Sequence, residues 1–164
     1  MPPRPLTIGV KLLSPQARMP RRAYADDAAW DLFAAEGAVI APLSRAVVGT
    51  GIAIGLRPGL AALTLPRSGL AARHGISVVN APGLVDPGYR GEVKVILLNT
   101  DEHETFVVAR GDRIAQLLLV SLPDVHLDQV GDLDDTHRGG RGFGSSGRRE
   151  SHEQTDRAKG PRRR

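Results

Sequence analysis

The stretch at residues 80–92, NAPGLVDPGYRGE, places an acid, an aromatic ring, a guanidinium and a second acid within seven residues. Its Asp-Pro-Gly-Tyr segment suits a tight turn, because Pro87 presets φ at about −65° and Gly88 accepts a positive φ. A carboxylate within hydrogen-bond reach of a water molecule can orient that water and take its proton, so Asp86 is a candidate general base. In isolation, however, Asp86 is more simply explained as a turn residue, and Tyr89 as a packing aromatic.

Four other stretches stand out, and they are AAWDL (28–32), PRSGLAARHGI (66–76), GDRIAQL (111–117) and RGGRGFGSSG (138–147). Each has an ordinary structural explanation, since RSG is a common loop composition, Asp31 suits a cap or a surface acid, and GDR is typical of a β-turn. Arg67, Arg90 and Arg113 are each explained as solvated or paired with a surface carboxylate, an interaction worth about 0–1 kcal/mol. The five stretches carry a functional signal only together, in their order and spacing.

The composition excludes several kinds of catalytic and metal site. At 164 residues the chain is long enough for one domain with a real core and too short for two ordinary domains. The absence of cysteine excludes disulfides, thiolate zinc sites and a cysteine nucleophile, which leaves Ser, Thr or an activated water. The five histidines show no paired ligand spacing, so zinc is not expected. Without a signal-peptide core or a long apolar run, a cytoplasmic protein with no membrane partner is expected.

The net charge of +4 is concentrated at the end of the chain. Residues 148–164 contain seven Lys or Arg and three Asp or Glu, whereas residues 1–147 contain fifteen of each kind. The basicity therefore says little about the folded part, and no specific nucleic-acid binding is expected. A tail that binds polyanions remains an alternative.

Short apolar runs separated by Gly and Pro favour strands over helices. Eight such runs predict an all-β domain of the sandwich, jelly-roll or barrel type. They lie at residues 6–13, 37–42, 45–56, 59–66, 75–82, 91–99, 104–111 and 113–123. Residues 68–74 suit one helical turn, and residues 28–35 are ambiguous between helix and strand.

After residue 130 the composition becomes polar and rich in glycine, so this part cannot bury enough surface to fold alone. We therefore predict a β domain at 1–130, a flexible Gly-rich arm at 131–147 and a basic disordered tail at 148–164. Phe143 stands out within the arm, because an aromatic ring among glycines suits a segment that closes over a flat ligand.

In order and spacing, the five stretches resemble the five motifs of the trimeric dUTP pyrophosphatases (dUTPases), over about residues 6–147. The first motif departs from the usual pattern, because Ala-Trp stands at 29–30 where Gly-Tyr is common. The resemblance implies a distorted jelly-roll or β-clip-like barrel, and a homotrimer with active sites at subunit interfaces. It also implies hydrolysis of dUTP to dUMP and pyrophosphate with Mg²⁺, which limits uracil in DNA and supplies dUMP for thymidylate synthesis.

The same resemblance assigns the nucleoside to residues 80–92, where backbone N–H and C=O groups can face the acceptor, donor, acceptor edge of uracil. Asn80, Leu84 and Val85 are expected to bind the substrate there. Tyr89 is expected to pack on the sugar and to block a ribose 2′-OH. Asp86 corresponds to the catalytic base, which also contacts the 3′-OH.

The phosphates are assigned to the second and fourth motifs, since a departing pyrophosphate needs cations and N–H donors. Arg67, Ser68 and Gly69 match the phosphate-binding positions. Gln116 matches a catalytic position that contacts phosphate or the attacking water. Asp31 matches an acid that holds Mg²⁺ through ordered waters.

The fifth motif implies a lid from a neighbouring subunit, with Arg138 at the terminal phosphate, Phe143 stacked on uracil and Gly144 also at the substrate. Arg141 stands where the family usually has a glycine. If that position needs a positive φ, Arg141 strains the closed arm by about 1 kcal/mol or more. Alternatively, Arg141 supplies a second cation near the phosphates.

Two other functions fit parts of the sequence. A dCTP deaminase, or a bifunctional deaminase and dUTPase, has the same fold but attacks C4 of cytosine and does not normally carry the Gly-rich phenylalanine arm. A non-catalytic dUTP-binding regulator would keep the pocket and act through partners.

Overall fold

The computed structural model of the protein describes residues 6–141. Within this range eleven strands and one helix are formed, where the sequence predicts eight strands and one helical turn. In chain order they are β1 (Gly9–Leu12), β2 (Trp30–Phe33), β3 (Ala38–Ile40), β4 (Arg45–Gly49), β5 (Ile52–Gly55), β6 (Leu60–Leu65), α1 (Ser68–His74), β7 (Ile76–Val78), β8 (Gly83–Val85), β9 (Lys94–Asn99), β10 (Phe106–Val108) and β11 (Arg113–Ser121).

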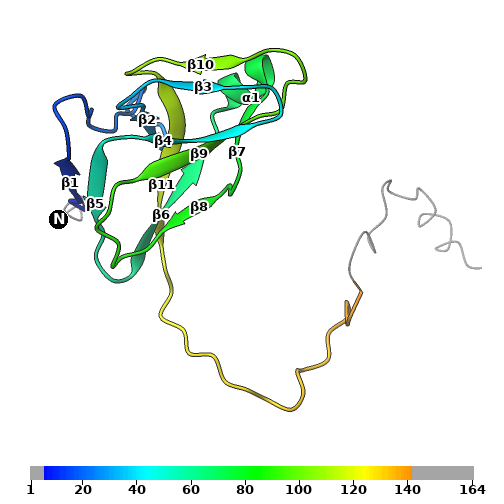
Figure 1. The fold of residues 1–164 in the computed structure, drawn as a ribbon. Helices are drawn as coiled ribbons and strands as arrows, with labels where there is room; N and C mark the ends of the chain where they lie inside the picture. Colours follow the sequence, from blue (N-terminus) through cyan, green and yellow to red (C-terminus); the bar gives the residue numbers. More distant parts are fainter. Residues whose placement is uncertain (1–5, 142–164) are drawn as a thin grey trace, which may run out of the picture. The chain divides into compact units, whose positions relative to one another are not determined.

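The strands form four small antiparallel sheets (Figure 1). The largest has the order β2-β11-β6-β8, and the next has the order β4-β9-β7. The remaining two sheets are the pairs β1-β5 and β3-β10. The predicted all-β class is confirmed, and the longest strand, β11, lies between β2 and β6 in the sheet that carries most of the candidate site.

Two predicted strand runs have other bounds in the structure, and the ambiguous run is resolved. The run at 45–56 is divided into β4 and β5, because Gly51 turns the chain with φ +66° and has the Cβ of Ala17 and Ala35 too close to accept a side chain. The ambiguous run at 28–35 forms strand β2. The run at 75–82 contains only β7, after which a cis bond before Pro82 leads into β8.

The stretch at 80–92 is not part of a two-stranded hairpin. Its first flank, β8, pairs with β6, whereas its second flank, β9, pairs with β4 and β7. The loop thus connects two sheets. Local sequence could not reveal this, because both flanks have the strand pattern whichever partners they find.

The core follows from alternation along these strands. In β9, for example, every second residue is buried, and each buried apolar side chain contributes about 1.5–3 kcal/mol. Asn99, at the end of β9, is fully buried, but its amide donates to the carbonyls of Ile40 (3.1 Å) and Glu104 (2.8 Å). The largest fully buried side chains are Leu32, Ile40, Val48, Ile52, Ile54, Leu56, Ile76, Val93, Val95, Leu97, Val108 and Ile114.

The chain divides into two units, Met1–Val125 and His126–Arg164. All strands and the helix belong to the first unit. In the described part of the second unit, Leu127 and Leu133 are almost fully exposed. No helix in the range 6–141 is long and apolar enough to cross a bilayer.

Candidate active site

Asp31 is a buried acid in the middle of β2, with only 6% of its side chain exposed. Its backbone exchanges hydrogen bonds with Arg21 on one side (2.9 and 3.3 Å) and lies directly opposite Gln116 of β11 on the other. Directly opposed residues of an antiparallel pair share one face, so Asp31 and Gln116 project on the same side. The neighbouring Trp30 packs under the guanidinium of Arg22, 4.0 Å from its ring centroid.

Two arginines bind the Asp31 carboxylate, one at each oxygen. Arg67 Nε lies 3.2 Å from Oδ1, and Arg113 Nη1 lies 3.1 Å from Oδ2. Arg67 also donates from Nη1 to the backbone carbonyl of Arg113 (3.2 Å). A buried carboxylate is costly unless it is paired, and here one acid fixes two cations, which leaves a local excess of positive charge. We call Asp31, Arg67, Arg113 and Gln116 the arginine cluster.

Arg113 is the member of this cluster that sequence reasoning did not assign to the site. The register between β11 and β2 shifts between Arg113 and Ala115, so β11 carries an extra residue there. Regular alternation would put Arg113 and Gln116 on opposite faces, and the bulge removes that separation. The only sequence signal was the arginine of GDR, which is equally typical of a surface turn.

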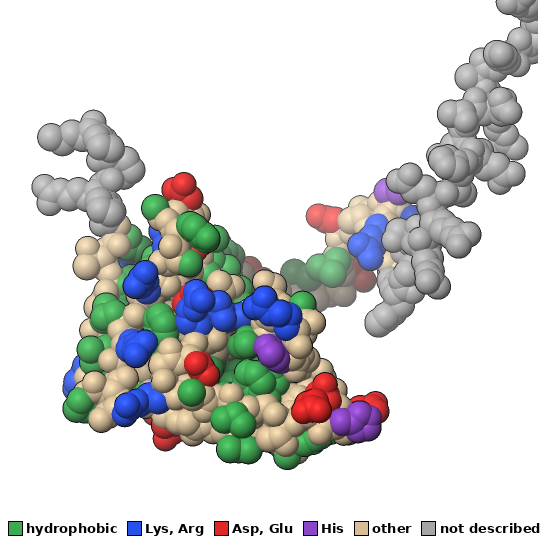
Figure 2. Space-filling view, turned by 90° about the horizontal axis from the view of Figure 1, so that it is seen from above, with side chains coloured by type: hydrophobic (Ala, Val, Ile, Leu, Met, Phe, Trp, Pro, Cys, Tyr) green, Lys and Arg blue, Asp and Glu red, His purple; other side chains and the backbone are tan. Residues whose placement is uncertain are grey.

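The helix α1 begins directly after Arg67 and places Ser68 and Gly69 in its first turn. The N–H groups of Leu70 and Ala71 both donate to the Arg67 carbonyl (3.0 Å each), so those of Ser68 and Gly69 have no partner within the helix. A cleft of about 340 Å³ is lined here by residues that include Arg67, Arg113, His74 and Phe106. Seen from above, the face with β3, β10 and α1 displays several Lys and Arg side chains close to one another (Figure 2).

The second group of predicted residues lies on β8 and the loop that follows. β8 is the edge strand of its sheet, with Val85 buried and Leu84 exposed. Asp86 is exposed and accepts a hydrogen bond at its carbonyl from the N–H of Tyr89 (3.1 Å), so the predicted turn forms. Gly88 does not take the positive φ that its position allowed. A cleft of about 190 Å³ is lined by residues that include Leu84, Val85, Asp86 and Tyr89.

Asn80 and Gly83 lie side by side at the start of β8. A Cβ on Gly83 would lie 3.1 Å from Asn80 Nδ2 and would collide with Thr64 Oγ1, so only glycine fits. Arg90 holds the far side of the loop by donating to the carbonyls of Pro87 (2.6 Å) and Leu56 (3.4 Å). We call residues 80–92 the turn loop.

Within one chain, Asp86 of the turn loop lies far from Arg67 of the arginine cluster. In the register of β6 and β8, Val85 is opposite Ala62, so Asp86 is level with the beginning of β6, whereas Arg67 follows its end. At about 3.3 Å per residue, Asp86 and Arg67 are about 20 Å apart along the strand. A ligand that spans both groups within one chain would have to cover this distance.

Arg138 lies in the second unit, where residues 136–141 form a turn. Arg138 Nε donates to the Arg141 carbonyl (3.0 Å), and Arg141 Nε donates to the Arg138 carbonyl (2.9 Å). Within the described residues Leu43 is the only non-glycine with a positive φ, so Arg141 is unstrained in this conformation. Phe143 and Gly144 lie outside the described residues, and their predicted roles, like the strain in a closed arm, stay predictions.

The arginine cluster suits a metal ion only if most of the ion's ligands come from a bound substrate. Between residues 6 and 141 no three His, Cys, Asp or Glu side chains are grouped so as to hold an ion. Asp31 is the one acid of the cluster, and both of its oxygens are taken by guanidinium groups. Such a carboxylate suits contact through water to a hydrated Mg²⁺ that is bound mainly by substrate oxygens.

Comparison with known proteins identifies the family of this chain. The family model described as dUTPase matches residues 15–147. A deoxyuridine 5'-triphosphate nucleotidohydrolase of Corynebacterium glutamicum is 50% identical over 141 residues, which cover 86% of this chain and 95% of that protein. The Staphylococcus bacteriophage 80alpha dUTPase with dUPNHPP has a TM-score of 0.80 at 32% identity, covering 86% and 98% of the two chains. A mutant dUTPase of phage phi11 of S. aureus, described with a structural Mg(II) ion, has a TM-score of 0.73 at 28% identity, covering 77% and 98%. This chain belongs to the dUTPase family and has its jelly-roll-like β fold.

Proposed function

We propose that this protein hydrolyses dUTP to dUMP and pyrophosphate, and so limits uracil in DNA and supplies dUMP for thymidylate synthesis. The proposal is supported by membership of the family at 50% identity to a named dUTP nucleotidohydrolase. The observation that carries it is the open edge of β8, which ends at Val85 and leads directly into Asp86 and the turn that carries Tyr89.

The edge of β8 is suited to recognise uracil. The strand pairs with β6 on one side, so its other side offers backbone N–H and C=O groups to a ligand. Uracil presents an acceptor, a donor and a second acceptor, which the backbone of Leu84 and the amide of Asn80 can match. Cytosine has an amino donor in place of O4 and leaves buried groups unpaired, at about 1–3 kcal/mol for each.

Asp86 and Tyr89 act on the next part of the nucleotide. Tyr89 packs its ring on the deoxyribose, where a ribose 2′-OH would not fit. Asp86 binds the 3′-OH and acts as the general base, because its exposed carboxylate can hold a water in line with the α-phosphorus and take its proton.

The arginine cluster receives the phosphates. Arg67 and the N–H groups of Ser68 and Gly69 bind the phosphate oxygens. Arg113 adds a second cation that Asp31 holds at a fixed distance. Gln116, on the same face as Asp31, contacts a phosphate or the attacking water.

Asp31 would hold a hydrated Mg²⁺ through ordered water, and the phosphate oxygens of the substrate would supply its direct ligands. When bound, the ion neutralises charge on the phosphate chain as the pyrophosphate leaves. Pairing with two arginines keeps the Asp31 carboxylate in place for this contact.

A homotrimer with shared sites explains how groups about 20 Å apart along one strand meet at one nucleotide. The turn loop of one subunit faces the arginine cluster of its neighbour. The arm then closes over the nucleotide, with Arg138 at the terminal phosphate and with Phe143 and Gly144 over uracil. Stacking of this kind is worth about 1–3 kcal/mol for each base.

Pyrophosphate release from a panel of nucleotides tests the proposal. With Mg²⁺ we expect rapid release from dUTP and little from dTTP, dCTP or UTP, and we expect activity to be lost in a version that ends before Arg138. Ammonia release from dCTP would instead identify a deaminase. Tight binding of dUTP without hydrolysis would contradict the catalytic role of Asp86.

A further inference from the structure

The ring of Tyr89 is positioned by the backbone of Gly91 and Glu92, shortly before β9. Its hydroxyl donates to the carbonyl of Glu92 (2.9 Å). A Cβ on Gly91 would lie 2.5 Å from the Tyr89 hydroxyl oxygen and 2.7 Å from the ring carbon that bears it, so the ring lies directly on this backbone. Since 45% of Tyr89 is exposed, its place depends on where Gly91 and Glu92 are held.

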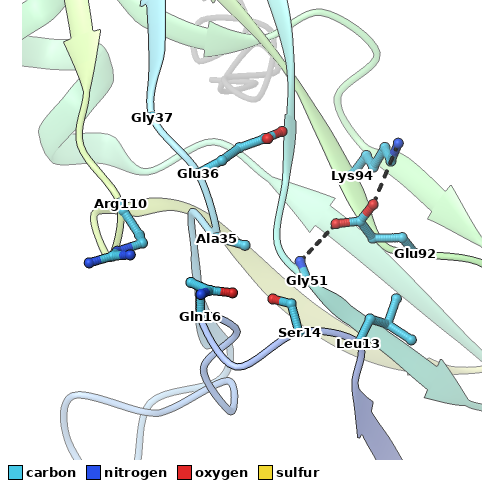
Figure 3. Close-up of a pocket in the computed structure, with 10 residues that line it drawn as sticks. All are labelled: Leu13, Ser14, Gln16, Ala35, Glu36, Gly37, Gly51, Glu92, Lys94 and Arg110. Atoms are coloured by element: carbon cyan, nitrogen blue, oxygen red, sulfur yellow. Dashed lines mark hydrogen bonds and ion pairs between the residues drawn. The ribbon is translucent and has the colours of Figure 1, made fainter.

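Glu92 is in turn tied to a fixed part of the core. Its Oε1 accepts the N–H of Gly51 (2.8 Å), and its Oε2 lies 3.4 Å from Lys94 Nζ (Figure 3). Gly51 is itself buried, with the Cβ atoms of Ala17 and Ala35 against it. The Gly51 N–H is therefore a rigid anchor for the side chain, and Lys94, with 55% of its side chain exposed, is a weak one.

The space for this carboxylate exists because residue 49 is a glycine. A Cβ on Gly49 would lie 2.6 Å from Glu92 Oε1 and 3.4 Å from Glu36 Oε1. The two carboxylates are therefore neighbours with like charge, both lining a cleft of about 900 Å³ beside the loop (Figure 3). Glu92 keeps its position against this repulsion through the hydrogen bond from Gly51.

We propose that Glu92 is a positioning residue that fixes Tyr89 through the Gly51 hydrogen bond and so sets the discrimination between deoxyribose and ribose. The inference rests on the proposed function, in which Tyr89 packs on the sugar. Without the anchor, the backbone of Gly91 and Glu92 and the ring that lies on it are free to shift, which makes room for a 2′-OH. What matters is the reach of the side chain rather than its charge, because Gln can also accept the Gly51 N–H whereas Asp is one methylene too short.

Four variants of the full chain separate reach from charge: Glu92→Ala, Glu92→Asp, Glu92→Gln and Lys94→Ala. The measurement is kcat/KM for dUTP and for UTP, together with the thermal unfolding midpoint. We expect the dUTP to UTP ratio to fall about tenfold in Glu92→Ala and Glu92→Asp, since a small misplacement of a sugar contact is costly. Glu92→Gln and Lys94→Ala are expected to keep the ratio of the wild type.

A ratio within twofold of the wild type in folded Glu92→Ala or Glu92→Asp would overturn the inference, as would a tenfold fall in Glu92→Gln. If Glu92→Ala does not fold, the comparison of Glu92→Asp with Glu92→Gln decides the question. Failure of the proposed function is a separate result, because it would appear as a wild-type protein that does not prefer dUTP to UTP.

Discussion

The arginine cluster and the turn loop are built in different ways, one from charged side chains and the other mainly from backbone. The cluster is built from side chains on strands and a helix start, and a buried carboxylate holds its two cations 3.1 and 3.2 Å away. The turn loop is built mainly from backbone at a sheet edge, and its acid, Asp86, is exposed. Charge that is to bind a polyanion is best fixed in advance, whereas the edge of a pyrimidine can be matched by backbone N–H and C=O groups, which every residue except proline carries.

Two aspartates with the same charge are therefore expected to have different tasks, because their surroundings differ. Asp31 has both oxygens paired and serves the structure of the cluster, while Asp86 keeps its carboxylate available to a water. The same substitution at each position separates the two tasks.

The largest effect is expected from Asp86→Asn, which keeps the size of the side chain and removes the base. We expect the rate of dUTP hydrolysis to fall at least about a hundredfold. Since Asp86 is exposed, the unfolding midpoint in urea is expected to stay close to that of the wild type. Turnover near the wild-type rate would place the base elsewhere.

The matching change in the arginine cluster, Asp31→Asn, is expected to lower the stability of the fold. It leaves Arg67 and Arg113 without their carboxylate, so the free energy of unfolding should fall by about 1–2 kcal/mol. This is less than for a fully buried pair, because 48% of the Arg113 side chain is exposed. Urea unfolding checks the value, and an unchanged midpoint would mean that the two ion pairs do not stabilise the fold.

Crowding at the start of β8 is expected to lower the stability by a similar amount. Gly83→Ala should lower the free energy of unfolding by about 1–3 kcal/mol, since the added methyl group meets Thr64 of β6. It should also weaken dUTP binding, because the backbone of β8 must move. Gly88→Ala is the control, since nothing lies within 4 Å of the added methyl group there. Equal effects of the two changes in urea unfolding would argue against a tightly packed β8.

Much of the fold was predictable, because alternation and the Gly and Pro breaks identify strands locally. The helix at residues 68–74 and most strand positions were found in this way. The partners of the strands were not, since β8 and β9 look like one hairpin in sequence but belong to two sheets. Pairing depends on contacts between distant segments that no local pattern records.

The candidate site was likewise predictable only in part. Motif order indicated Asp31, Arg67, Asp86 and Gln116, and the structure brings three of them together. Arg113 was missed, because the bulge that turns it toward Asp31 leaves no trace in the hydrophobic pattern. The hydrogen bond from the Gly51 N–H to the Glu92 carboxylate was missed as well, because the two residues are far apart in the sequence and meet only after folding.

The central claim is that the turn loop and the arginine cluster of one site come from two copies of the chain. Complementation tests it most directly, with Asp86→Asn and Arg67→Ala, each nearly inactive alone, refolded together in equal amounts. Random mixing pairs an intact loop with an intact cluster in about one quarter of the sites, so dUTP hydrolysis should recover to a corresponding fraction of the wild-type rate. A mixture no more active than its two components would contradict the claim.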